Sequence, residues 1–416
     1  MTIENHPYYN YYKTSNKKYS GKVFALYHDL NSSEKDLLWY LPNFEDQFEK
    51  IDLLKEPNES LQDLYLKRAT ELRNEYDYLI LNYSGGPDSH NILETFMLNG
   101  IFLDEIFIYS CFDENTVARF QKYDHETFMM HPEFYEAERS ALPLAKYFVE
   151  NHSPLTKITY VNNFHELHKK YWINQNKKSF NDSLNGNANV MLTHRNMPRS
   201  VDPNFSKNWK NIKEKKKTAH IWGLEKPRLS YDESGIFFFL TDQTILSRID
   251  LQSILTHENV PNNHELFYIH PTAVEMYIKQ AHVIMNSFDK DAFLNSSKNY
   301  VSTRKNENLM AQVVYDQKIK IPYYGLKLSD LLNEHKNFSF LRKMSETGII
   351  PGYADMTETI NMKLYFDNPN DDASKKYDEF VQFIHQNFFV KFISQKEMLY
   401  KLALGTSSKK HYIKYF

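Results

Sequence analysis

The sequence predicts an α/β protein built around a parallel β-sheet. A largely apolar stretch, 77–83, leads through a glycine-rich turn into an amphipathic helical pattern and then into a second apolar stretch, 105–110. A further helical pattern precedes the apolar stretch 157–161, and 219–223 has the composition of another buried strand. Strands that alternate with helices indicate right-handed βαβ units, in which ligands bind at the carboxyl ends of the strands.

The helix before the first strand is marked by its start signal and its apolar stripe. Ser60 can cap the helix, and Asp63 stands where a capping box has an acidic residue. Helical spacing also relates Leu61, Leu64, Tyr65, Ala69 and Leu72. After the glycine turn, the second helix continues through 91–98 and ends at Asn99-Gly100, which is a typical stop signal.

Later elements follow with less regular spacing. We expect a helix from His131 to Phe148, interrupted at Pro143, a short helix over 164–172, and a long loop over 174–218. A hairpin strand over 235–240 and an amphipathic helix from Pro271 to Phe288 come next.

The chain length suggests two or three structural units. We expect an N-terminal extension over 1–60, irregular except for a strand candidate at 22–27. A nucleotide-binding domain should cover 61–245, and a mixed, mostly helical substrate or interaction region should cover 246–416.

Composition excludes several classes of protein. A net charge of −3 gives no overall electrostatic attraction to nucleic acid, and no apolar run is long enough to span a membrane. The sequence also starts without a basic and apolar leader, so we expect a cytoplasmic protein. Cys111 is the only cysteine, which excludes an intramolecular disulfide and a multi-cysteine metal site within this sequence.

The turn Ser84-Gly85-Gly86-Pro87-Asp88-Ser89 carries the strongest chemical signal. The chain has only 11 glycines, and two adjacent ones let main-chain N–H groups approach an anion closely. The helix that follows adds unpaired N–H groups and the positive end of its dipole, and Pro87 suits its first turn. A plain turn of ordinary turn residues is the alternative.

This Ser-Gly-Gly-x-Asp-Ser turn resembles the pyrophosphate loop of the ATP pyrophosphatases, which include asparagine, GMP and NAD synthetases and tRNA thiolases. The resemblance implies a three-layer core of the HUP type, like that of the adenine nucleotide alpha hydrolases. It further implies that Ser84, Gly85, Gly86, Pro87 and Ser89 bind ATP. Paired cysteines are common in the sulfur-transferring branch of the family, so the lone Cys111 argues against that branch.

A second polar segment, Gly223-Leu224-Glu225-Lys226-Pro227-Arg228, follows the strand at 219–223 and resembles a Gly-x-[Asp/Glu]-Lys element of the same family. Lys226 and Arg228 are suited to a polyphosphate, whereas a solvated surface turn is the alternative. Mg²⁺ is the expected metal, because it bridges phosphates with only one or two protein carboxylates. The resemblance implies Asp88 as its first ligand, and Glu225 is a weaker candidate. Ser110, at the end of the second strand, is expected to border the adenine.

The resemblance implies an enzyme that uses ATP and Mg²⁺ to adenylate a carboxyl or carbonyl oxygen, after which an amine or ammonia displaces AMP. Asp88, Lys226 and Arg228 are the expected catalytic residues. The acceptor, a small molecule or a nucleic acid, is not identified, and the sequence leaves open a homo-oligomer. Two alternatives stay open: a base-modifying enzyme acting on tRNA or DNA, and a nucleotide sensor without turnover. The Lys-Pro-Arg element and the helix 271–288 are also similar to a bacteriophage subgroup of the family.

Overall fold

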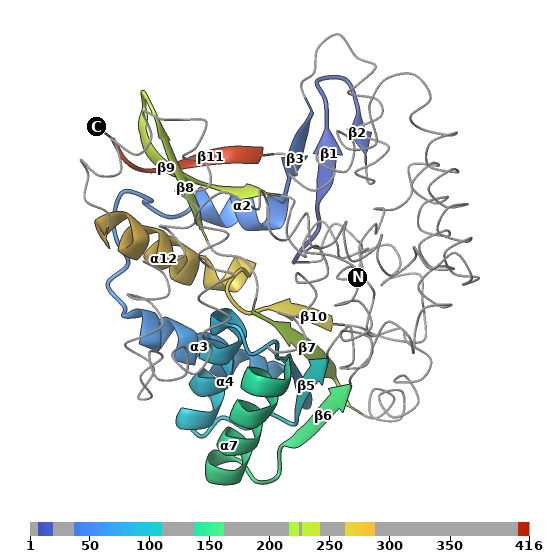
Figure 1. The fold of residues 1–416 in the computed structure, drawn as a ribbon. Helices are drawn as coiled ribbons and strands as arrows, with labels where there is room; N and C mark the ends of the chain where they lie inside the picture. Colours follow the sequence, from blue (N-terminus) through green and yellow to red (C-terminus); the bar gives the residue numbers. More distant parts are fainter. Residues whose placement is uncertain are drawn as a thin grey trace, which may run out of the picture.

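The computed structural model describes residues 7–19, 37–109, 137–161, 216–223, 227–241, 263–287 and 407–415. In this part of the chain the protein has a mixed α/β fold with one five-stranded parallel sheet and two small antiparallel sheets (Figure 1). The prediction of an α/β protein with a parallel sheet is therefore confirmed at this level.

The parallel sheet has the strand order β10-β7-β4-β5-β6. Read from β6 to β10, the strands are the third, second, first, fourth and fifth of this sheet in chain order. The chain therefore reverses direction across the sheet between β4 and β7, which is where open α/β sheets bind their ligands. The strands are β4 (Tyr78–Asn82), β5 (Glu105–Tyr109), β6 (Lys157–Val161), β7 (Thr218–Trp222) and β10 (Asn263–Leu266).

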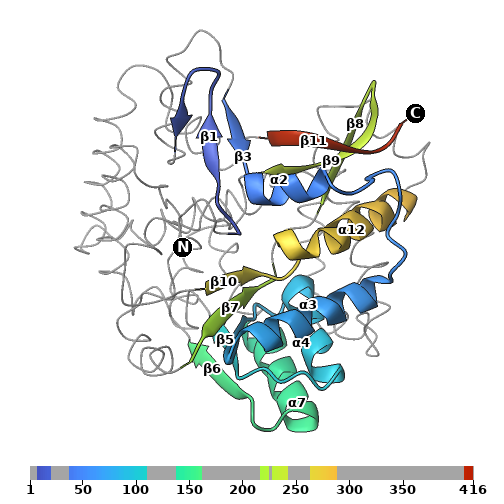
Figure 2. The same cartoon turned by 180° about the vertical axis from the view of Figure 1, so that it is seen from behind.

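Three helices, α3 (Leu61–Glu75), α4 (Pro87–Leu98) and α7 (Leu142–His152), lie on one face of the parallel sheet (Figures 1 and 2). The start and stop signals predicted for α3 and α4 have the expected roles in the structure. The Ser60 side chain accepts a hydrogen bond from the Asp63 N–H and caps α3. α4 starts at Pro87 and ends before Gly100, whose φ of 66° is the left-handed conformation that favours glycine at a helix end.

The helix expected from His131 to Phe148 is described only from residue 137 onward. A π-helical turn, Ala137–Ala141, leads directly into α7, which continues past Phe148 to His152. Pro143 stands in the first turn of α7, where its missing N–H costs no hydrogen bond. The predicted interruption therefore marks a change from π-helix to α-helix.

The described N-terminal segment is not irregular, so that expectation is wrong. β1 (Tyr11–Lys13) pairs antiparallel with β2 (Lys18–Tyr19) and with β3 (Leu38–Tyr40), and α2 (Pro42–Phe48) follows. Alternate residues of these strands, such as Tyr12, Tyr19 and Trp39, are buried. The alternation of buried and less buried residues in β1 could not be recognised from apolar and polar residue types, because tyrosine occupies both faces of this strand.

A second small sheet has the order β11-β9-β8. β8 (Arg228–Asp232) and β9 (Gly235–Thr241) form the expected hairpin, and β11 (Ser407–Lys414) pairs antiparallel with β9. The latter pairing brings the end of the sequence into contact with its middle, which no local pattern indicated.

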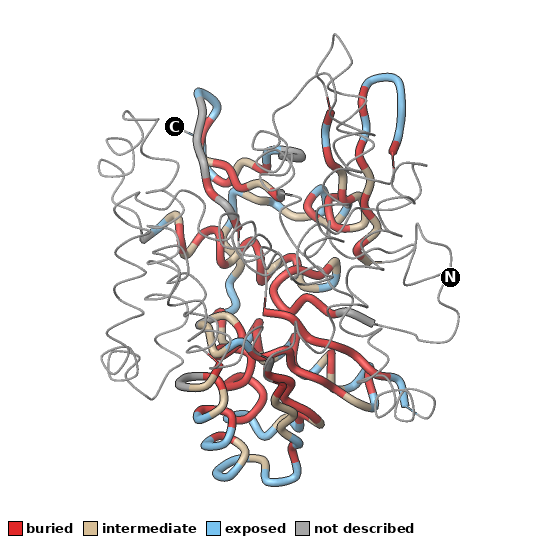
Figure 3. Tube along the Cα trace, turned by 45° about the vertical axis from the view of Figure 1, so that its right-hand side comes forward, coloured by how far each residue is buried: buried red, intermediate tan, exposed pale blue. Residues whose placement is uncertain are grey.

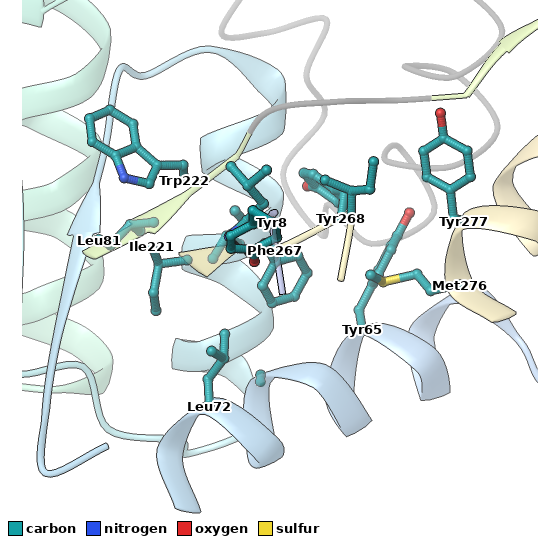
Figure 4. Packing of buried hydrophobic residues seen from close by; sticks show 14 of the residues in the cluster. Tyr8, Tyr65, Leu72, Leu81, Ile221, Trp222, Phe267, Tyr268, Met276 and Tyr277 are labelled. Carbon is teal, nitrogen blue, oxygen red and sulfur yellow. Dashed lines mark hydrogen bonds between the residues drawn. The ribbon is translucent and has the colours of Figure 1, made fainter. Parts of the chain in front are cut away.

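The parallel sheet extends past residue 245, where the sequence led us to expect a domain boundary. β10 pairs with β7, and α12 (Val274–Ser287), preceded by a 3-10 turn at Pro271–Ala273, packs against α3. Figure 4 shows core residues of α3, β4, β7 and α12 around Phe267 and Tyr268, which follow β10. One buried cluster includes residues from the small sheets as well as from the parallel sheet.

A buried polar network joins the N-terminal segment to β10. Glu265 accepts hydrogen bonds from Arg68 (2.7 Å), from the Tyr76 hydroxyl (2.5 Å) and from the Tyr8 hydroxyl (3.2 Å). The Tyr8 hydroxyl in turn accepts a bond from the Leu266 N–H (2.8 Å). Residue 8 is thus held at the carboxyl end of β10.

The strand candidate at 22–27 and the helix over 164–172 lie outside the described residues, as does nearly all of the long loop over 174–218. Among the helices that the structure describes, none has the length and apolar character needed to cross a membrane.

Candidate functional site at the ends of β4 and β7

The glycine turn begins where β4 leaves the sheet. The Tyr83 N–H still donates to the Phe107 carbonyl of β5 (2.9 Å), so the chain stays in the sheet until this residue. Ser84 is exposed, and Gly85 and Gly86 are half-buried. Gly85 has a φ of 81°, a left-handed conformation that costs a residue with a side chain about 1–2 kcal/mol.

Two serines close the turn. Ser84 Oγ and Ser89 Oγ are 3.1 Å apart, and Ser89 Oγ also accepts from the Ser84 N–H (3.2 Å) and donates to the Gly86 carbonyl (3.1 Å). The Gly86 N–H donates to Ser84 Oγ (3.3 Å). An anion that used the Gly86 amide would therefore replace Ser84, whose exposed hydroxyl can rotate away.

The N-terminus of α4 faces the turn. Gly86 is the N-cap residue and supplies no side-chain hydrogen bond, and the first helical bond runs from the His90 N–H to the Gly86 carbonyl (3.0 Å). The positive end of the helix dipole thus lies beside the glycines. Asp88, in the first turn, is half-buried there.

Two contacts from elsewhere in the chain fix this arrangement. A Cβ atom on Gly85 would lie 2.8 Å from the backbone nitrogen of Ala141, at the end of the π-helical turn. A Cβ atom on Gly223 would lie 2.9 Å from the backbone nitrogen of Ser89 and 3.0 Å from the carbonyl carbon of Asp88. Since Gly223 directly follows β7, the start of the second polar segment touches the first turn of α4.

A chain of buried polar side chains begins at Tyr83, the residue directly before the turn. The Tyr83 hydroxyl is hydrogen-bonded to His90 Nδ1 (2.7 Å), and His90 Nε2 lies 3.7 Å from a carboxyl oxygen of Glu94. All three residues are fully buried. Burial raises the pKa of Glu94 to about 9, so that this carboxyl group is protonated at neutral pH.

A second support comes from the segment after β10. The Tyr268 hydroxyl donates to the Asp88 carbonyl (2.8 Å) and accepts from the Asn91 side-chain amide (2.9 Å). Neither Tyr268 nor the Tyr83, His90 and Glu94 chain was identified from the sequence. The only available signal was the presence of several polar residues, among them 90, 91 and 94, between the apolar residues of helix α4.

The structure brings together Ser84, Gly85, Gly86, Asp88 and Ser89, with Pro87 as the first residue of α4. Arg228 is the first residue of β8, and its backbone pairs with Phe239; its side chain is not described. Ser110, Glu225 and Lys226 lie outside the described residues.

Within the described part of the chain, no group of three or more His, Cys, Asp or Glu side chains is arranged to hold a metal ion. Mg²⁺ bound through phosphates needs only one or two protein carboxylates, so Asp88 beside the glycine turn is compatible with that kind of site. Comparison of the chain with protein-family models, with curated proteins and with solved structures finds no match.

Proposed function

We propose that this protein is an ATP-dependent adenylating enzyme with a three-layer core of the HUP type, which converts ATP to AMP and pyrophosphate. The single observation that carries the proposal is the position of the glycine turn. It lies at the reversal point between β4 and β7, against a helix N-terminus that has no side-chain cap. Both glycine contacts, at Gly85 and at Gly223, leave no room for a Cβ atom.

The geometry suits a polyphosphate better than it suits a plain turn. A turn that only reversed the chain would need neither a left-handed glycine packed on Ala141 nor a second glycine packed on Ser89. Ser84 is exposed and Gly85 and Gly86 are only half-buried, so an anion can approach the main chain at the two glycines. The Ser-Gly-Gly-x-Asp-Ser resemblance points to the same chemistry.

In the proposed reaction, the amides of the turn and of the first turn of α4 bind the β- and γ-phosphates. Lys226 and Arg228 offset the negative charge that develops at the α-phosphate and on pyrophosphate. Asp88, with Glu225 as a second ligand, would hold Mg²⁺, which neutralises phosphate charge when bound. A carboxyl or carbonyl oxygen of the acceptor attacks the α-phosphorus, the bond to pyrophosphate breaks, and an amine or ammonia then displaces AMP.

Release of pyrophosphate tests this function. Wild-type protein should release pyrophosphate from Mg²⁺–ATP in the presence of the correct pool of amino acids, nucleosides or RNA. Ser84→Ala and Asp88→Ala should reduce the rate by about 10- to 1,000-fold, because each loses a group beside the phosphates.

The control is Asp63→Ala, which removes an exposed carboxylate that belongs to the cap of α3 and not to the turn. Equal rates for wild type and both site variants contradict the assignment of the site. Tight binding of ATP with no pyrophosphate release from any pool instead favours the nucleotide-sensor alternative.

A further inference from the structure

The outer face of the small sheet β2-β1-β3 carries a group of tyrosines and lysines. Tyr8 and Tyr12 point to the core and are buried, whereas Tyr9, Tyr11 and Tyr40 are only half-buried. Strands of an antiparallel sheet with one solvated face normally present polar residues there. Three aromatic rings on that face are therefore unexpected for a sheet that only covers a core.

The rings form a continuous group. Tyr11 and Tyr40 are direct cross-strand partners, and their rings are nearly parallel, 14° apart, with centroids separated by 5.4 Å. The ring of Tyr9 lies 5.7 Å from that of Tyr11. The Lys18 ammonium lies 3.9 Å from the centroid of the Tyr11 ring and also donates a hydrogen bond to the Tyr9 hydroxyl.

Lysines lie beside these rings, and Glu45 of α2 is an acidic residue that acts electrostatically on Tyr11. Lys13, Lys17 and Lys18 are exposed, and the segment 7–19 contains no acidic residue. Figure 3 shows the turn between β1 and β2 exposed to solvent. A ligand that matches both features has planar rings to stack and regularly spaced negative charges. Single-stranded nucleic acid has both, because its bases are not paired and its backbone is anionic.

We propose that this tyrosine–lysine face (Tyr9, Tyr11, Lys13, Lys18 and Tyr40) binds single-stranded nucleic acid. The bases stack on the tyrosines, and the lysines contact the phosphates. The net charge of −3 for the whole chain does not oppose this, because the face is locally basic. The inference goes beyond the proposed function and does not depend on it, since binding here needs no ATP.

The location of the face connects it to the candidate site. Tyr8, which precedes the face in the chain, is hydrogen-bonded to the Leu266 N–H at the carboxyl end of β10. The glycine turn follows the carboxyl end of β4 in the same parallel sheet. The segment that carries the face and the glycine turn are thus both connected to carboxyl ends of strands in the parallel sheet.

Fluorescence anisotropy with labelled oligo(dT) and oligo(U) of about 12 nucleotides, added to the full chain without ATP, tests the inference. Wild type should bind both, with an affinity that falls as salt rises. Tyr11→Ala and Tyr40→Ala should each weaken binding by about 5- to 100-fold, as expected for the loss of one stacked base. Tyr11→Phe keeps the ring and should bind like wild type.

Lys18→Ala should reduce the slope of log affinity against log salt by about 0.7, as expected for one phosphate contact of a single strand. Tyr147→Ala and Lys146→Ala are matched controls, since they remove an exposed tyrosine and an exposed lysine of α7. Both should leave binding unchanged. The lysine and phenylalanine variants keep the test decisive even if loss of Tyr11 or Tyr40 unfolds the small sheet.

Three results would overturn the inference. The first is no binding by wild-type protein at low salt. The second is equal affinity of wild type, Tyr11→Ala, Tyr40→Ala and Lys18→Ala. The tyrosines would then be cross-strand pairs that only stabilise the sheet. The third is displacement of the oligonucleotide by poly-glutamate as effectively as by unlabelled oligo(U), which would indicate an acidic protein partner instead.

Discussion

Gly85 and Gly100, near the two ends of α4, share a left-handed backbone but differ in their surroundings. Their φ angles are 81° and 66°. A Cβ atom on Gly85 would meet the backbone of Ala141 at 2.8 Å, whereas a Cβ atom on Gly100 would meet nothing within 4 Å. At Gly100 only the conformation favours glycine. At Gly85 both the conformation and the space require it.

This difference predicts a difference in stability. Gly100→Ala should lower the free energy of unfolding by about 1–2 kcal/mol, the cost of the left-handed conformation. Gly85→Ala should cost at least about 1 kcal/mol more, because the backbone of Ala141 has to move. Urea denaturation of the two variants measures both losses. Equal losses would show that the turn is loosely packed against Ala141.

Glu94 predicts a pH dependence. Burial raises the pKa of its carboxyl group from 4.5 to about 9, so between these pH values the folded protein keeps a proton that the unfolded chain releases. Through this one group, the free energy of unfolding then falls by about 1.4 kcal/mol for each unit by which the pH rises. Glu94→Gln has the same shape and does not titrate.

The stability of Glu94→Gln relative to wild type should therefore increase as the pH is raised from about 5 to about 8. Urea denaturation at several pH values measures this difference, in which contributions from other titrating groups cancel. A difference that stays constant with pH would mean that Glu94 is ionised in the folded protein over this whole range.

At the scale of elements, the strongest connection between α3 and β10 is a buried ion pair. Arg68 and Glu265 are 2.7 Å apart and almost fully buried, whereas Lys67 and Glu275, which join α3 to α12, are exposed and 3.8 Å apart. Removing one member of a buried pair leaves an uncompensated charge in the core, but an exposed pair contributes little.

Glu265→Ala should therefore lower the free energy of unfolding by about 3–5 kcal/mol, and Glu275→Ala by less than about 1 kcal/mol. Chemical denaturation of both variants provides the comparison. In a double-mutant cycle with Arg68→Ala, the buried pair should couple by more than about 1 kcal/mol. Additive losses would contradict a direct interaction between the two side chains.

Elements with complete local signals could be predicted from the sequence. α3 has its cap at Ser60, α4 has Pro87 at its start and Gly100 after its end, and β4 to β6 are short apolar stretches. β10 could not be predicted, because three of its four residues, Asn263, His264 and Glu265, are polar. It forms a strand because its backbone pairs with β7 and because Glu265 forms an ion pair with Arg68.

The same distinction applies to the candidate site. The glycine turn is contiguous, so its residue types and spacing indicate it directly. The contacts that fix it come from Ala141, Gly223 and Tyr268, which are 56 to 183 residues from Gly85 in the chain. No pattern within the sequence reports such contacts, since they depend on how βαβ units pack.

At the scale of the whole molecule, the N-terminal segment, the parallel sheet, α12 and β11 contribute to one buried cluster. Ranges that the sequence separates into an extension, a nucleotide-binding domain and a C-terminal region thus share a core. This arrangement puts the glycine turn and the tyrosine–lysine face on one body. A ligand of the face and a ligand of the turn could then be held in a fixed relation.

Titration of Mg²⁺–ATP by isothermal calorimetry, with wild type, Gly85→Ala and Gly100→Ala, tests most directly the claim that the turn at the end of β4 binds a polyphosphate. Wild type and Gly100→Ala should bind with the same affinity, and Gly85→Ala should bind about tenfold more weakly or worse, a loss of about 1.4 kcal/mol or more. Equal affinity of all three proteins, or no binding by wild type at millimolar ATP, would contradict the claim.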